Sequence, residues 1–234
     1  MIIVQLVKNS ATLVEALLSV LAFVVALVLS LTLHEVAHGV VALWNGDPTA
    51  KLSGRLSLDP TKHFDPVGLV VMLVCGFGWA KPVPVNPYNF EKRRVGMFTV
   101  SVAGIVTNFL LAFLFALPCA AILGARVQAE SFTYYLLSFL LSLSSMMVMF
   151  NVSLALFNLL PLYPLDGSRI LGCVIGEDNK VMNFLRRYSI YVLLGLVALS
   201  YVPVVKNYSP FNWYLVDFRN VIYNAFISFW GLIV

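Results

Sequence analysis

Long uninterrupted runs of apolar residues dominate the pattern along this chain. Such runs cover residues 12–43, 96–123 and 132–160. Each is long enough to cross a bilayer as a helix, which takes about 20 residues. A further apolar stretch covers residues 188–205, and an aromatic-rich tail at 211–234 either crosses the membrane or lies at its interface. The pattern predicts an all-α polytopic membrane protein, a bundle of about 4–6 transmembrane helices.

The region between the first two long runs has a different pattern. Residues 45–66 mix short polar and aliphatic stretches with Gly and Pro, which predicts a small strand and loop insertion. Residues 67–80 are apolar but short for a span and rich in glycine, which favours a re-entrant or interfacial element. Prolines exclude a helix through residues 81–87, and the next span is expected to break late, at Pro118.

Composition supports the membrane assignment and a single domain. The 234 residues are 60% hydrophobic and 11% charged, which leaves too little polar surface for a water-soluble fold. We predict one membrane-embedded domain over residues 1–234, with a core at about 12–175 and extra C-terminal membrane segments at about 188–234. No stretch is long enough for an additional PDZ or CBS domain, and no removed signal peptide is expected. The three cysteines are scattered without metal or redox spacing.

The placement of basic residues predicts the orientation. If residues 67–80 do not cross, the loops 45–66, 81–95 and 161–187 lie on one side of the membrane. They hold Lys51, Arg55, Lys62, Lys81, Lys92, Arg93, Arg94, Arg169, Lys180, Arg186 and Arg187, whereas the other side holds Lys8, Arg126 and Lys206. Because cytoplasmic loops are enriched in Lys and Arg, these loops are expected in the cytoplasm. The same bias accounts for the net charge of +4, so no nucleic-acid partner is expected.

The first apolar run contains a pattern typical of zinc proteases. His34, Glu35 and His38 form an HExxH motif. On a helix the two histidines stack on one face, where their imidazoles can hold one zinc ion. Glu35 lies about 100° around the helix, where a general base for a zinc-bound water belongs. Roughly 10 Å of helix separates His38 from the turn at Asn45, so the site is expected inside the membrane near the cytoplasm.

A catalytic zinc usually has three protein ligands and one water, so a third ligand is needed. The candidates are His63, Glu177 and Asp166. Asp166 lies in NLLPLYPLDG, where two prolines and a glycine unwind the chain just after a span. Glu177 lies in an ordinary polar loop.

At these residues the sequence resembles the site-2 protease family of intramembrane zinc metalloproteases (peptidase family M50). HEVAH and NLLPLYPLDG carry the resemblance, and GDPTAKLSGRLSLDPTKHFDP and GWAKPVPVNPYNF support it over residues 30 to 175. The resemblance implies that His34, His38 and Asp166 bind Zn2+ and that Glu35 is the catalytic glutamate.

The resemblance also implies roles for other residues and partners. Asn158 matches an asparagine thought to bind substrate or the developing oxyanion, Asn108 matches a packing element, and His63 lies outside the ligand set. Ile105 stands where the family often has proline. Family members cut single-pass membrane proteins, often anti-sigma factors or other membrane-tethered regulators. The partners expected here are therefore a transmembrane protein substrate and the lipid bilayer of the plasma membrane.

Two other functions use the same ligands. A metal transporter or sensor would usually show further intramembrane His, Asp or Glu along a path across the bilayer, and the chain has three histidines in all. An inactive helix-binding scaffold would not need Glu35. The sequence therefore favours peptide hydrolysis in or near the membrane. The segment from Ala50 to Leu58 is expected either to pair with an extended substrate by edge addition or to form a structural loop hairpin.

Overall fold

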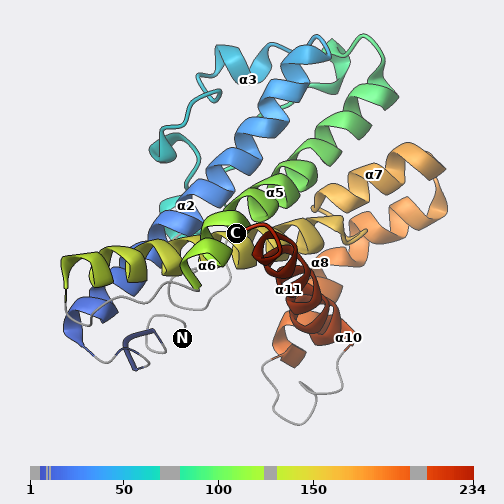
Figure 1. The fold of residues 1–234 in the computed structure, drawn as a ribbon. Helices are drawn as coiled ribbons and strands as arrows, with labels where there is room; N and C mark the ends of the chain where they lie inside the picture. The colour runs from blue at the N-terminus through green and yellow to red at the C-terminus, as the bar shows by residue number, and fades with distance from the viewer. Residues whose placement is uncertain (1–5, 9, 11, 69–79, 124–130, 201–209) are drawn as a thin grey trace.

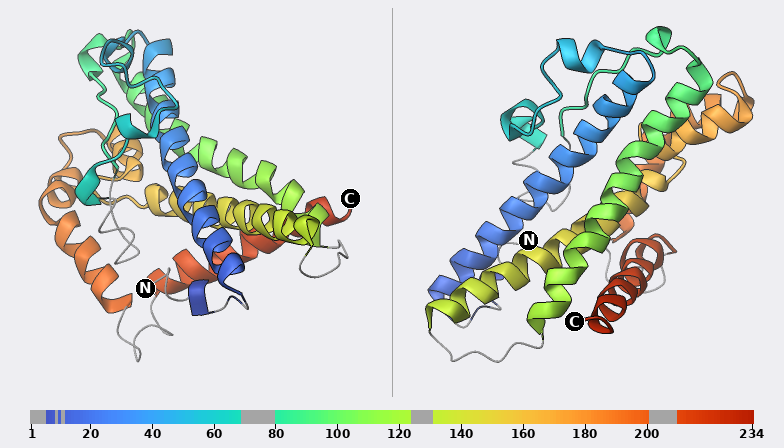
Figure 2. Two further views of the ribbon diagram at one scale, coloured as in Figure 1. Left: turned by 90° about the vertical axis from the view of Figure 1, so that its left-hand side faces the viewer. Right: turned by 45° about the horizontal axis from the view of Figure 1, so that its top comes forward.

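Three long helices form the centre of the computed structural model, which describes residues 6–8, 10, 12–68, 80–123, 131–200 and 210–234. They are α2 (Leu13–Trp44), α5 (Arg93–Leu123) and α6 (Phe132–Leu159). Helices α2 and α5 lie side by side, and α6 crosses and contacts both (Figures 1 and 2). These are the three described helices that are long and apolar enough to cross a membrane. The predicted all-α membrane fold is confirmed, and each predicted run matches a helix to within one turn.

Shorter elements surround these helices. They are α3 (Thr49–Leu52), η1 (Pro60–Lys62), η2 (Pro87–Asn89), α7 (Asp166–Ile175), α8 (Lys180–Ser200), α10 (Pro210–Asn212), η3 (Trp213–Asp217) and α11 (Phe218–Gly231).

A polar contact joins the N-terminal ends of α2 and α6. The Thr12 hydroxyl accepts a hydrogen bond from the Glu15 backbone N–H at 3.2 Å, and the Glu15 carboxylate accepts one from the Thr12 N–H at 3.3 Å. This reciprocal capping box satisfies two N–H groups at the start of α2. The other Glu15 oxygen accepts from the Tyr134 hydroxyl of α6 at 2.7 Å. The carboxylate that interrupts the first apolar run therefore fixes where α2 begins.

The C-terminal helices pack on the outer side of α5 and α6. The Trp230 indole donates to the Phe113 carbonyl at 2.8 Å, and the Tyr214 hydroxyl donates to the Leu156 carbonyl at 3.1 Å. Both carbonyls belong to long helices, so α11 and η3 lie against the bundle through polar as well as aromatic contacts (Figure 1). The tail at 211–234 is thus helical over most of its length.

The predicted strand insertion is wrong for the described residues 45–66. They form α3, η1 and turns, with one isolated antiparallel bridge between Phe64 and Ala80. The alternating stretch is short and contains Gly54, which adopts a positive φ of 65° that favours a turn over a strand. Of the predicted re-entrant element 67–80, residues 69–79 lie outside the described residues.

The predicted break at Pro118 is also wrong, since α5 continues to Leu123. A proline inside a helix removes one backbone hydrogen bond, and membrane helices tolerate this loss when neighbouring groups satisfy the freed carbonyl. The polar stretch 161–187 contains a helix, α7, and α8 begins at Lys180, eight residues before the predicted apolar span at 188. The first residues of α8 include several polar ones, so the pattern of apolar residues did not predict that the helix begins this early.

Asp47 holds the loops after α2 and before α5 together. Its carboxylate is fully buried and accepts hydrogen bonds from the Thr49 backbone at 3.1 Å, the Asn89 amide at 2.7 Å and the Asn86 backbone at 2.7 Å. Burial raises the pKa of Asp47, but these hydrogen bonds outweigh it and hold the pKa below its ordinary value. The loop that passes over the HExxH motif is therefore anchored at the end of α2.

Candidate metal centre

Two imidazoles on α2 meet at one point. His34 and His38 are one helical turn apart, and their Nε2 atoms lie 3.0 Å from each other. The two residues are 5% and 7% exposed, so both are buried. They stack on one face of the helix, as the motif predicts.

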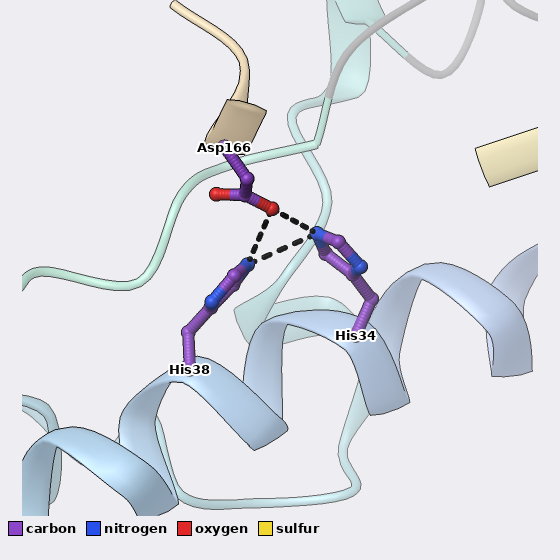
Figure 3. Close-up of side chains that lie close together, drawn as sticks. All are labelled: His34, His38 and Asp166. Atoms are coloured by element: carbon purple, nitrogen blue, oxygen red, sulfur yellow. Dashed lines mark hydrogen bonds and ion pairs between the residues drawn. The ribbon is translucent and has the colours of Figure 1, made fainter. Parts of the chain in front are cut away.

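The third side chain comes from a distant part of the sequence. Asp166 is the first residue of α7, which follows the turn after α6. Its Oδ2 atom lies 3.2 Å from His38 Nε2 and 3.4 Å from His34 Nε2 (Figure 3). The turn can fold this tightly because Gly167 has no side chain, and a Cβ there would overlap the carbonyl oxygens at the C-terminal end of α6.

The three converging atoms are suited to binding a cation and cannot all form hydrogen bonds with one another. His38 Nδ1 lies 2.7 Å from the Val100 carbonyl oxygen and must donate to it, so Nε2 of the neutral ring is an acceptor. Asp166 Oδ2 is buried without a hydrogen-bond partner among the described residues. Buried acceptors that face each other need a positive charge between them. One ligand atom from each residue lies within 4.8 Å of the others, and two His with a carboxylate form a donor set of catalytic zinc.

The carboxylate of Asp166 is suited to this role. It is buried beside the two imidazoles, and the ionised form of a carboxylate is the form that binds a metal.

Helix α5 lies directly against the two imidazoles. A Cβ built on Gly104 would overlap the His34 ring and come within 2.6 Å of His38 Nε2. Only glycine allows this approach without moving a ring. Together with the Val100 carbonyl, one turn earlier on α5, it sets the orientation of His38, as a backbone partner commonly does for a metal-binding histidine.

Glu35 is adjacent to this group but outside the set of three converging ligands. Its Oε2 atom accepts a hydrogen bond from the Val83 backbone N–H at 2.8 Å. Val83 lies in the proline-rich segment before α5, so a loop distant in sequence fixes the carboxylate. The position beside the ligands agrees with the one that helix geometry predicts.

The remaining sequence candidates lie elsewhere. The Asn158 amide donates to the Leu154 carbonyl within α6 at 3.0 Å, and no hydrogen bond joins Asn158 to the three ligands among the described residues. His63 is fully buried, with Nε2 2.8 Å from the Ser57 carbonyl oxygen. Glu177 is exposed and pairs with Arg93 at 3.3 Å. His63 and Glu177 are therefore not part of the candidate metal centre.

Sequence reasoning missed three contributors to this site: the Val100 carbonyl, Gly104 and the Val83 N–H. A backbone carbonyl inside an apolar helix leaves no mark in the sequence. Gly104 lies in the AGIVTN stretch, and the prolines on both sides of Val83 are visible signals of a constrained segment. Neither signal indicates which residue the segment touches.

Comparison with known proteins agrees with this geometry. A family model described as Peptidase family M50 matches residues 22–200. A protein of Bacillus subtilis (strain 168) named "Putative zinc metalloprotease YwhC" is 47% identical to this chain over 150 residues, which are 63% of this chain and 66% of that protein. This chain therefore spans slightly less than two thirds of that protein's length. No solved structure matches the chain.

Proposed function

Since the chain belongs to peptidase family M50, we propose that it hydrolyses peptide bonds in or near the transmembrane segments of other membrane proteins. The family match confirms the resemblance inferred from the sequence, and the zinc metalloprotease relative supports the proposed enzyme class. The substrate, its place in regulated intramembrane proteolysis and the orientation in the plasma membrane are part of the proposal.

One observation carries the intramembrane part of the proposal. The ligand atoms converge on α2, a helix of 32 residues that is long and apolar enough to span a membrane. Placing ionisable residues inside such helices costs free energy, so these residues usually have a function. A water-soluble metalloprotease would not need its HExxH motif inside an apolar helix of this length.

Each residue has a proposed role. His34, His38 and Asp166 would hold Zn2+, which when bound lowers the pKa of a water molecule and polarises the scissile carbonyl. Glu35 takes the proton from the attacking water and delivers it to the leaving amine. Asn158, at the C-terminal end of α6, would bind substrate or the developing oxyanion once its amide turns from the Leu154 carbonyl.

The proposed substrate is a membrane-tethered protein, such as an anti-sigma factor. Its helix must unwind at the cleavage site, because backbone hydrogen bonds hide the carbonyls of an intact helix. The bias of basic residues supports a metal centre in the cytoplasmic half of the bilayer. Water could reach the centre from that side.

The test compares the membrane proteomes of cells with the wild-type chain and cells with Glu35→Gln. We expect transmembrane fragments to accumulate in the variant, because the amide cannot accept the proton of the water. The purified variant should keep its zinc, whereas His34→Ala and Asp166→Ala should lose it. Equal proteomes together with full proteolytic activity of Glu35→Gln would overturn the proposal.

A further inference from the structure

The carboxylate of Glu35, the proposed catalytic base, accepts a hydrogen bond from a segment whose backbone is restricted by two prolines. Lys81-Pro82-Val83-Pro84 supplies the Val83 N–H that donates to Glu35 Oε2 at 2.8 Å. Proline fixes its own φ and drives the residue before it into an extended conformation. Two prolines in alternation therefore restrict all four residues. They also remove the neighbouring N–H groups, so Val83 N is an isolated donor between two residues that cannot donate.

This segment is tied down two residues before Val83. The Lys81 N–H donates to the His63 carbonyl at 2.8 Å, next to the bridge between Phe64 and Ala80. Pro82 and Pro84 restrict the backbone between this bond and Val83. The bond to His63 therefore limits how far the Val83 N–H can turn away from Glu35.

Arg55 holds the same residue through its carbonyl group. Its Nη2 atom donates to the Lys81 carbonyl at 2.6 Å. Arg55 is only 7% exposed, and its Nε atom has no partner within the described residues. A hydrogen bond from a charged guanidinium is stronger than one between neutral groups. Arg55 therefore holds the Lys81 carbonyl firmly.

We propose that Arg55 is a positioning residue for catalysis, which acts through Lys81 and the Val83 N–H to orient the Glu35 carboxylate. The inference rests on the proposed function, since it assigns Arg55 to the base of that reaction. One carboxylate oxygen is fixed by Val83, which leaves the other to receive the proton of the attacking water. A loose loop would let the carboxylate rotate away from the water.

Two matched pairs of variants test this role. Arg55→Met removes the donor and keeps most of the side-chain length, while Arg55→Lys keeps a charged donor. Val83→Pro removes the N–H and keeps an apolar side chain, while Val83→Ala keeps the N–H and removes part of the side chain. Arg186→Met, on the exposed surface of α8, is the control for loss of an arginine.

The probe is a quenched fluorescent peptide copied from a fragment that accumulates in Glu35→Gln membranes. We expect Arg55→Met and Val83→Pro to lower kcat about 10- to 100-fold with little change in KM, because a misplaced catalytic group slows the reaction without weakening binding. Arg55→Lys should recover most of kcat, and Val83→Ala should lose less than Val83→Pro. Zinc content should stay at the wild-type level in all four.

The outcomes separate this inference from the proposed function. If Glu35→Gln accumulates no fragment and stays active, the proposed function fails first. If Glu35→Gln is inactive but Arg55→Met and Val83→Pro keep wild-type kcat, Arg55 has no positioning role and the proposed function stands. Loss of zinc or a raised KM together with unchanged kcat would show that Arg55 only maintains the fold, which also overturns the inference.

Discussion

The two halves of α5 make different kinds of contact with the rest of the molecule. Near its start, Val100 accepts a hydrogen bond from His38 and Gly104 lies against both imidazoles. Farther along, Ala112 and Ala116 pack against apolar side chains of α6 and α11. The contacts of Val100 and Gly104 with the imidazoles depend on the direction of a hydrogen bond and on distances of tenths of an ångström. The apolar contacts of Ala112 and Ala116 depend mainly on how completely the space between the helices is filled. The first half should therefore tolerate very little change, and the second half should tolerate much more.

The strongest test of this difference is Gly104→Ala. The added Cβ would overlap the His34 ring and approach His38 Nε2, so an imidazole or α5 itself must move. We expect zinc content to fall and proteolytic activity to drop by about 100-fold or more, because metal sites require accurate ligand geometry. Metal analysis of the purified variant and cleavage of the fluorescent peptide measure the two effects.

Gly195→Ala is the matched control, since a Cβ on this α8 glycine meets nothing within 4 Å. It should keep its zinc and its activity. If Gly104→Ala also bound a full complement of zinc, α5 would not constrain the ligands as described.

Asp47 gives a second test at the same end of the molecule. Asp47→Asn keeps the shape but weakens the charged hydrogen bonds to Thr49, Asn89 and Asn86, and we expect it to cost about 1–3 kcal/mol of stability. Because the folded pKa lies below the ordinary value, this stability is fully present above about pH 4 and is lost as the pH falls further.

Thermal unfolding in detergent between pH 7 and pH 3 measures this effect. The difference between wild type and Asp47→Asn should shrink as the pH falls through the acid range. A constant difference at every pH would contradict the assigned role of the carboxylate.

The smallest effect is expected from a substitution that faces the second half of α5. Val152→Ala on α6 removes two methyl groups from the fully buried cluster with Ala112 and Ala116. We expect about 1–2 kcal/mol of destabilisation. The loss is one of van der Waals contact, since the hydrophobic effect does not drive helix association inside lipid. Activity per bound zinc should not change; a drop comparable to that of Gly104→Ala would erase the distinction between the two halves.

Local patterns in the sequence were enough to place the membrane helices and part of the site. The apolar runs gave α2, α5 and α6 to within one turn, because a helix in a bilayer must be apolar over a length set by the bilayer. The spacing of His34 and His38 placed both on one helix face, since that geometry depends only on the helical repeat. The prediction of a strand insertion at residues 45–66 was wrong because a short stretch of alternating polar and apolar residues is also compatible with turns.

The sequence by itself determined that this chain has helices long and apolar enough to span a membrane, and that α2 carries two imidazoles on one face beside a glutamate. The tertiary structure decided the rest. It brought Asp166 within 3.4 Å of both histidines, set Gly104 against their rings and joined Glu35 to Val83. Helix periodicity is a local property that a sequence displays directly. The approach of α5, α7 and the Lys81–Pro84 segment depends on packing between residues far apart in the chain, which no local pattern records.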